Sequence, residues 1–267
     1  MHWYRVGVLA VLALAAALWL SGCGGAGGAG TVRVLYAGSL QTVMNTRIAP
    51  AFRRATGYAF EGYPGGSKEL AGEIRSRVRT GDVFISAAPE LNATLEGRAY
   101  GNWVSSFSPF ATTALVLGYD PGSRFAHALR SEPWYRVVTR PGFRLGFTDP
   151  ELDPKGALTV TALERAAAAH RIPALRRLAG AQADVFPEED LVGRLESGQL
   201  DAGFFYTVEA GAAQIPTVSL APIDERATYT IAVLNRAPDR AAAGAFVRFL
   251  LGPRGQALLR AAGLRRP

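Results

Sequence analysis

The chain has 267 residues and a formal net charge of +7, from 29 Lys and Arg residues against 22 Asp and Glu residues. Its single cysteine excludes an intramolecular disulfide and a metal centre built from several cysteines. The length allows one large domain or two small lobes. The basic residues are dispersed, which does not favour a nucleic-acid surface.

The N-terminus has the order of a secretory signal: one positive charge, an apolar run from 6 to 20, and the small residues of Leu20-Ser21-Gly22-Cys23. The run is shorter than the roughly 20 residues that span a bilayer, although an uncleaved anchor helix is the alternative. The last four residues resemble a bacterial lipobox, so we expect a signal peptide at 1–22 and a lipid on Cys23. Residues 23–30 are then the lipidated cysteine and a glycine-rich tether. This predicts a protein that is exported and lipid-anchored to the outer face of the cytoplasmic membrane, or that lies in the periplasm.

The first elements predicted after the tether alternate between strand and helix. A β-rich run is followed by a small-residue turn and a helical segment that Gly57 ends. In the next helix Leu70, Ile74 and Val78 recur with a spacing of four, which is one face of a helix. The order of strand, helix and strand is typical of an α/β fold. The predicted elements here are strands at 32–36, 58–62 and 82–86 and helices at 40–55 and 69–78.

The rest of the chain continues with strands and longer helices. Asp153 and Pro154 precede an alanine-rich helix, and proline suits the first helical turn because its missing N–H needs no partner there. The acids of Pro187-Glu188-Glu189-Asp190 are expected to begin another helix, at the positive end of its dipole. We expect strands at 111–119, 144–147, 201–206 and 228–234, and helices at 156–170, 187–197, 240–251 and 253–262.

Two α/β units of this size predict two lobes that face each other across a cleft, because open α/β sheets bind ligands at the carboxyl ends of their strands. Lobe I is expected at residues 31–110 together with 226–267, and lobe II at residues 111–225. The chain then crosses between the lobes twice, which predicts a two-stranded hinge. A single large doubly wound domain is the alternative.

Ser39 and Ser67 each lie between a strand end and a helix start. Helix N-termini carry unpaired N–H groups and a partial positive charge, so two that converge can bind an anion. Each serine hydroxyl can add a donor. For either serine alone, ordinary N-capping is the other interpretation.

Five segments in order are more specific than either serine: Ala37-Gly38-Ser39-Leu40, Gly65-Gly66-Ser67-Lys68, Asp82-Val83-Phe84-Ile85-Ser86, Leu152-Asp153-Pro154-Lys155 and Asp201-Ala202-Gly203-Phe204-Phe205-Tyr206. Together they resemble the substrate-binding proteins of molybdate and tungstate ABC importers, over residues 32–264. The resemblance implies an α/β fold of the two-lobed periplasmic-binding type, class II, with mixed sheets flanked by helices, that closes on a tetrahedral oxyanion. It implies the ligand-binding residues Ser39, Ser67, Asp153, Pro154, Lys155 and Tyr206. Lys155 is expected to donate through its backbone N–H and Tyr206 through its phenol, while Tyr206 as an ordinary core residue is the alternative.

A carboxylate such as Asp153 is unexpected in an anion-binding site, because it repels a dianion. One explanation is that it caps the helix beginning at Pro154 and faces away from the ligand. The other is that Mo(VI) and W(VI) accept further oxygen ligands, whereas the sulfur of sulfate does not. The Leu-Asp-Pro pattern is similar to the tungstate-type branch of the family, in which two carboxylates complete octahedral coordination. The resemblance then implies Asp153 as one carboxylate, and we choose Glu225 as the second.

Other functions find less support in the sequence. A lipid-anchored hydrolase needs a nucleophile and a base, but the mature chain has only His127 and His170 and no Gly-x-Ser-x-Gly elbow. A solute-binding protein for sulfate, phosphate or an organic anion is the closer alternative. We therefore expect a monomeric binding protein that is not an enzyme and has no cofactor and no free metal ion. Its expected partners are molybdate or tungstate, an ABC permease and, through the lipid, the membrane, with no nucleic acid.

Overall fold

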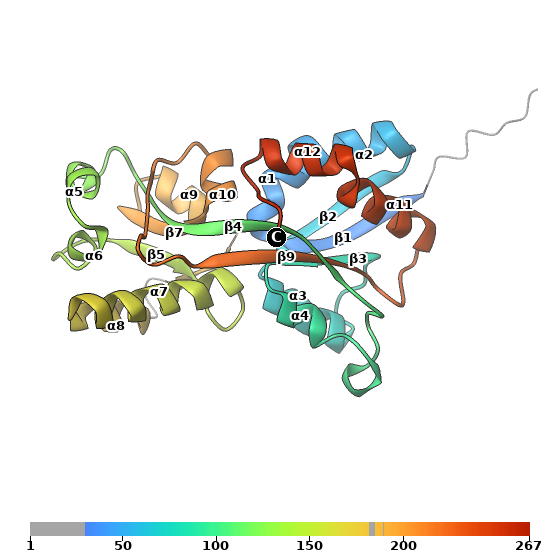
Figure 1. Cartoon of the computed structure of the whole chain (residues 1–267), viewed down its shortest axis with the longest axis horizontal. Coiled ribbons are helices and arrows are strands. Elements are labelled where there is room, and N and C mark those ends of the chain that lie inside the picture. The colour runs from blue at the N-terminus through green and yellow to red at the C-terminus, as the bar shows by residue number, and fades with distance from the viewer. Residues whose placement is uncertain (1–29, 182–184, 189) are drawn as a thin grey trace, which may run out of the picture.

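The computed structural model describes residues 30–181, 185–188 and 190–267 (Figure 1). The predicted signal peptide, the lipidated Cys23 and the tether up to residue 29 lie outside these residues and stay predictions. None of the helices in the described part of the chain combines the length and the hydrophobicity that a membrane span requires.

A mixed sheet runs through the molecule. β1 (Thr31–Ala37) pairs in parallel with β2 (Ala59–Gly65) and β3 (Val83–Ser86), and β5 (Leu145–Thr148) pairs in parallel with β6 (Val185–Phe186) and β7 (Ala202–Tyr206). Two longer strands, β4 (Ser108–Tyr119) and β9 (Arg226–Val233), pair antiparallel with each other and connect the two parallel groups. The strand order is β2-β1-β3-β9-β4-β7-β5-β6, and β8 (Thr217–Val218) pairs with β4.

The helices gather into two groups, and β4 and β9 extend from one group to the other (Figure 1). The half with β1, β2 and β3 contains α1 (Gln41–Val43), α2 (Ala49–Thr56), α3 (Ser67–Ser76), α4 (Pro89–Ala93), α11 (Arg240–Leu251) and α12 (Pro253–Ala261). The half with β5 and β7 contains α5 (Ala126–Ser131), α6 (Trp134–Val137), α7 (Pro154–His170), α8 (Pro173–Ala179), α9 (Leu191–Glu196) and α10 (Thr207–Ala212). Short 3-10 segments, η1 (Gly38–Leu40) and η3 (Arg98–Tyr100), and a π segment, η2 (Met44–Ile48), complete the first half. The lobe boundaries given above stay a prediction.

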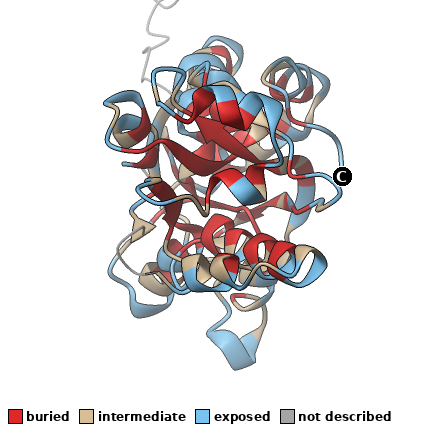
Figure 2. Ribbon diagram, turned by 90° about the vertical axis from the view of Figure 1, so that its left-hand side faces the viewer, coloured by how far each residue is buried: buried red, intermediate tan, exposed pale blue. Residues whose placement is uncertain are grey.

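Burial follows these layers. Figure 2 shows buried strands enclosed by helices whose outer faces are exposed. β3 is buried at every position, as predicted for a nearly continuous apolar strand covered on both faces. Phe52 of α2 and Phe246 of α11 pack edge to face with 5.2 Å between ring centroids. The first half is therefore assembled from the beginning and the end of the chain.

Some helix limits agree with the sequence predictions and others differ. Gly57 ends α2 with a φ of 79°, and α11 spans the predicted residues. α3 ends at Ser76 instead of residue 78, because Arg77 adopts the left-handed region with a φ of 60°. The prediction that a helix begins at Pro187 is wrong, because α9 begins at Leu191. Glu188, which was expected at the N-terminus of this helix, instead binds the N–H groups of Gly38 and Ser39 in η1.

Candidate ligand-binding site

Four of the predicted binding residues lie at strand ends, and one of them, Asp153, lines a cavity. Ser39 follows β1, Ser67 follows β2, Asp153 follows β5 and Tyr206 ends β7. These positions are where open α/β sheets bind ligands. A cavity of about 600 Å³ lies between the two halves, and its lining includes Gly65, Gly66 and Glu69 from one half and Leu152, Asp153 and Glu188 from the other.

Glu188 reaches across to the first serine turn. Its Oε2 accepts a hydrogen bond from the backbone N–H of Gly38 at 2.8 Å, and its Oε1 accepts one from the backbone N–H of Ser39 at 3.0 Å. The Ser39 hydroxyl lies 2.9 Å from the Tyr229 hydroxyl. The two N–H groups therefore hold an anionic group that comes from the opposite half of the molecule.

The turn at Ser67 also contacts the opposite half. The backbone N–H of Lys68, in the first turn of α3, donates to the Leu152 carbonyl oxygen at 3.0 Å. A Cβ atom at Gly66 would lie 2.7 Å from that oxygen, so this approach requires glycine. The Ser67 hydroxyl accepts a hydrogen bond from the Ala87 N–H at 3.1 Å. The two halves are closed against each other at this point.

Asp153 uses one carboxylate oxygen as a cap and leaves the other without a hydrogen bond. Its Oδ1 accepts from the Lys155 N–H at 2.8 Å, which caps α7, and Pro154 occupies the first turn. This bond engages the N–H that was expected to bind the ligand. Oδ2 is buried and, like the Thr148 hydroxyl, makes no hydrogen bond of normal length among the described residues. Burial raises the pKa of Asp153, while the nearby Lys155 charge and the Thr148 hydroxyl oppose the rise.

The Lys155 side chain is fully buried and faces carboxylates. Its Nζ lies 2.9 Å from both oxygens of Glu209 and 3.5 Å from Oε1 of Glu188. Burial by itself lowers the pKa of the ammonium group, but Glu209, Glu188 and Asp153 outweigh burial and raise it. Lys155 is therefore charged in the folded protein.

Tyr206 is fully buried at the end of β7, and its hydroxyl has no hydrogen-bond partner among the described residues. Burial, and then the negative charge of Asp153, raise the pKa of the phenol, so it keeps its proton. Its ring meets the Tyr229 ring edge to face with 6.3 Å between centroids. The phenol is therefore a fixed donor near Asp153 that has no acceptor in the described protein.

Glu225 makes its contacts outside this group of residues. Its Oε1 lies 2.8 Å from Nη1 of Arg165 on α7, and the contacts of the described residues do not join it to Asp153. Its role as a second carboxylate stays a prediction. Glu188 and Glu209, which the sequence analysis did not choose, lie in the site. The acidic run at 187–190 was the available signal for Glu188, but it was interpreted as a helix start, and Glu209 had no comparable signal.

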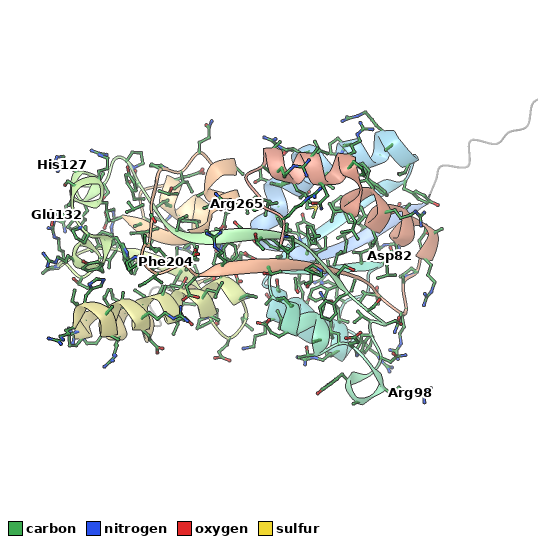
Figure 3. The ribbon with its side chains drawn as sticks, in the orientation of Figure 1. Asp82, Arg98, His127, Glu132, Phe204 and Arg265 are labelled. Atoms are coloured by element: carbon green, nitrogen blue, oxygen red, sulfur yellow. The ribbon has the colours of Figure 1, made fainter. Side chains whose placement is uncertain are left out.

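The histidines that a hydrolase would need lie elsewhere in the described chain. His127 lies at the outer end of the half that contains α5 and α6, with Glu132 close by (Figure 3). The His170 ring stacks on Tyr135 with 3.6 Å between centroids. Within the described ranges, no group of three or more His, Cys, Asp or Glu side chains could hold a metal ion.

Comparison with known proteins supports a solute-binding protein. The sequence profile described as bacterial extracellular solute-binding protein matches residues 32–265. The molybdate/tungstate-binding protein WtpA of Thermococcus kodakarensis is 24% identical and aligns over 94% of this chain and 89% of its own. The periplasmic molybdate-binding protein of Azotobacter vinelandii has a TM-score of 0.68 and 21% identity, covering 88% of this chain and 99% of its own. The sulfate-binding protein SubI of Mycobacterium tuberculosis H37Rv has a TM-score of 0.65 and 18% identity, covering 88% of this chain and 86% of its own. The predicted two-lobed periplasmic-binding fold is thereby confirmed.

Proposed function

The chain belongs to the bacterial extracellular solute-binding protein family, and we propose that it binds molybdate or tungstate and delivers the oxyanion to an ABC importer. The relative named as a molybdate/tungstate-binding protein supports this class of ligand. A sulfate-binding protein has the same fold, so the choice of oxyanion depends on the site and not on the fold. Binding and delivery need no catalytic step, and we propose none.

The observation that carries this proposal is a pair of buried polar atoms, Asp153 Oδ2 and the Tyr206 hydroxyl, that lack partners among the described residues. Leaving such an atom unpaired costs about 1–3 kcal/mol, so two of them in one site indicate a missing ligand. The phenol needs an acceptor oxygen, and the carboxylate needs an electron-poor centre. Molybdate and tungstate offer both, because Mo(VI) and W(VI) accept further oxygen ligands. Sulfate offers only acceptor oxygens, and phosphate, which keeps a proton at neutral pH, adds an O–H donor but no centre that accepts a carboxylate ligand.

Glu188 is the carboxylate that we propose as the second ligand of the molybdenum or tungsten centre. It lines the same cavity as Asp153 and already reaches the N–H of Ser39. When the oxyanion binds, its oxygens take the place of the Glu188 carboxylate at the N–H groups of Gly38 and Ser39. The turn at Ser67 and the Tyr206 phenol bind the other oxygens. Asp153 and Glu188 then complete the octahedral coordination.

We place the hinge of this binding protein at β4 and β9, so that residues 31–110 with 226–267 rotate against residues 111–225. The hydrogen bond from Lys68 to the Leu152 carbonyl joins these two lobes.

We further propose that the protein is exported as a monomer and held at the membrane by a lipid on Cys23. The glycine-rich tether then keeps the loaded protein close to its permease while the lobes open and close.

Titration calorimetry of the purified protein with molybdate, tungstate, sulfate and phosphate tests the proposed function. We expect tight binding of the first two and much weaker binding of the others, since only Mo(VI) and W(VI) can be coordinated by both carboxylates. Small-angle scattering should show compaction when tungstate is added to the open protein. Tight sulfate binding would overturn the ligand assignment in favour of a binding protein for another anion.

Glu188→Gln and Glu225→Gln separate the two candidates for the second carboxylate. We expect Glu188→Gln to weaken tungstate binding at least about tenfold, which is about 1.4 kcal/mol, because a neutral amide is a poor ligand for the metal centre. Glu225→Gln removes the charge that pairs with Arg165, and we expect a smaller loss. Calorimetry measures the tungstate affinity of both variants, after thermal unfolding has shown that they are as stable as the wild type. A larger loss in Glu225→Gln would return the role to Glu225.

A further inference from the structure

Lys155 is the only basic side chain that is buried among the described residues. A buried charge is costly unless it is paired and hydrogen-bonded. Its Nζ lies 5.9 Å from the ring centroid of Phe205 and 5.8 Å from that of Tyr206. Lys155 therefore cannot collect anions from the solvent, and its charge acts inside the protein.

The ion pair of Lys155 and Glu209 joins the two chain segments that carry the unpaired polar atoms. Lys155 follows Asp153 in the first turn of α7, and Glu209 follows Tyr206 in the first turn of α10. Nζ contacts both Glu209 oxygens at 2.9 Å, and Glu209 Oε2 also accepts the Tyr206 N–H at 3.3 Å. The pair therefore fixes the positions of Asp153 and Tyr206 relative to each other.

Lys155 also contacts the remaining carboxylate of the site. Its Nζ lies 3.5 Å from Glu188 Oε1, and Glu188 binds the N–H groups of Gly38 and Ser39. One ammonium group thus faces Glu188 and Glu209 directly and also attracts Asp153. Without it, three buried negative charges would repel one another and any dianion that enters. With it, the carboxylates stay in place and part of their charge is offset.

We infer that Lys155 and Glu209 are positioning residues that determine oxyanion specificity, because they hold Asp153 and Glu188 where both can bind a molybdenum or tungsten centre. This inference rests on the proposed function and adds two residues that need not touch the ligand. Tungstate gains from the carboxylates that the pair holds, whereas sulfate is only repelled by them. The pair therefore supplies both the attractive and the repulsive part of the specificity.

The test is the double variant Lys155→Met with Glu209→Gln, which removes both charges and leaves neither partner buried alone. We expect tungstate affinity to fall at least about tenfold and sulfate affinity to stay the same or rise. X-ray absorption at tungsten should show fewer oxygen neighbours in the variant than in the wild type. The matched control is Glu132→Gln with Arg140→Gln, an ion pair at the outer end near α5 and α6, which should leave both affinities unchanged (Figure 3).

An unchanged ratio of tungstate to sulfate affinity overturns the inference, because a purely structural pair lowers both affinities alike or neither. Glu209→Asp covers the case in which the double variant does not fold. It keeps both charges and withdraws the carboxylate by one methylene, so the ratio should fall by less. A wild-type ratio in Glu209→Asp also overturns the inference. A wild-type protein that binds no oxyanion refutes the proposed function instead, so the two failures are distinguishable.

Discussion

Asp153→Asn is expected to remove most tungstate binding while it makes the ligand-free protein more stable. Asparagine caps helices as well as aspartate does, so the bond from Oδ1 to the Lys155 N–H can be kept. The variant loses the negative charge of Oδ2, which is buried and has no hydrogen-bond partner among the described residues. Removing one charged partner of a buried contact costs about 2–5 kcal/mol, which is roughly thirtyfold or more in Kd.

The stability gain in this variant has a defined pH dependence. Burial raises the pKa of Asp153 in the folded protein above that of an unfolded aspartate. The folded state therefore holds the proton more tightly, and the free energy of unfolding of the ligand-free wild type falls as the pH rises from the unfolded pKa through the folded pKa. The variant lacks this fall, so we expect it to be more stable by about 0.5–2 kcal/mol at neutral pH and by less in acid. Thermal unfolding across the pH range measures the difference.

Asp239→Asn is the matched control, because Asp239 also caps a helix with a carboxylate oxygen. Its Oδ1 accepts the Ala242 N–H at 2.9 Å at the start of α11. This change should leave tungstate affinity unaltered. If Asp153→Asn also binds tungstate as the wild type does, Asp153 is a helix cap and not a ligand.

Lys155→Met alone is expected to destabilise the protein by about 3–5 kcal/mol, because it leaves buried carboxylates without their cation. Glu209 loses the contact that both of its oxygens make, and Glu188 loses a charge at 3.5 Å. Adding Glu209→Gln should recover most of this loss, since the neutral amide can still accept the Tyr206 N–H. Urea unfolding of the wild type, the two single variants and the double variant gives the coupling energy. A coupling energy near zero would contradict the buried ion pair.

The strands and long helices could be predicted because each depends on a local pattern. β3 is a continuous apolar run, and Gly57 ends α2 in a conformation that glycine adopts easily. Asp153 and Pro154 begin α7 with a cap and a residue that suits the first turn. The start of α9 could not be predicted in this way, because Glu188 binds the N–H of Gly38, 150 residues away in the chain.

The binding site likewise has features that depend on local sequence and features that depend on contacts between distant segments. The two serine turns, the helix start at Pro154 and the tyrosine at the end of β7 could be predicted from the sequence, since each of these features needs only its immediate neighbours. No local pattern predicted that Asp153 has a buried oxygen without a hydrogen-bond partner among the described residues, or that Glu188 and Glu209 surround the Lys155 ammonium. A cap or a strand is specified within a few residues. The pairing of buried charges depends on distances between separate elements, and these distances are set only when the two halves of the molecule pack together.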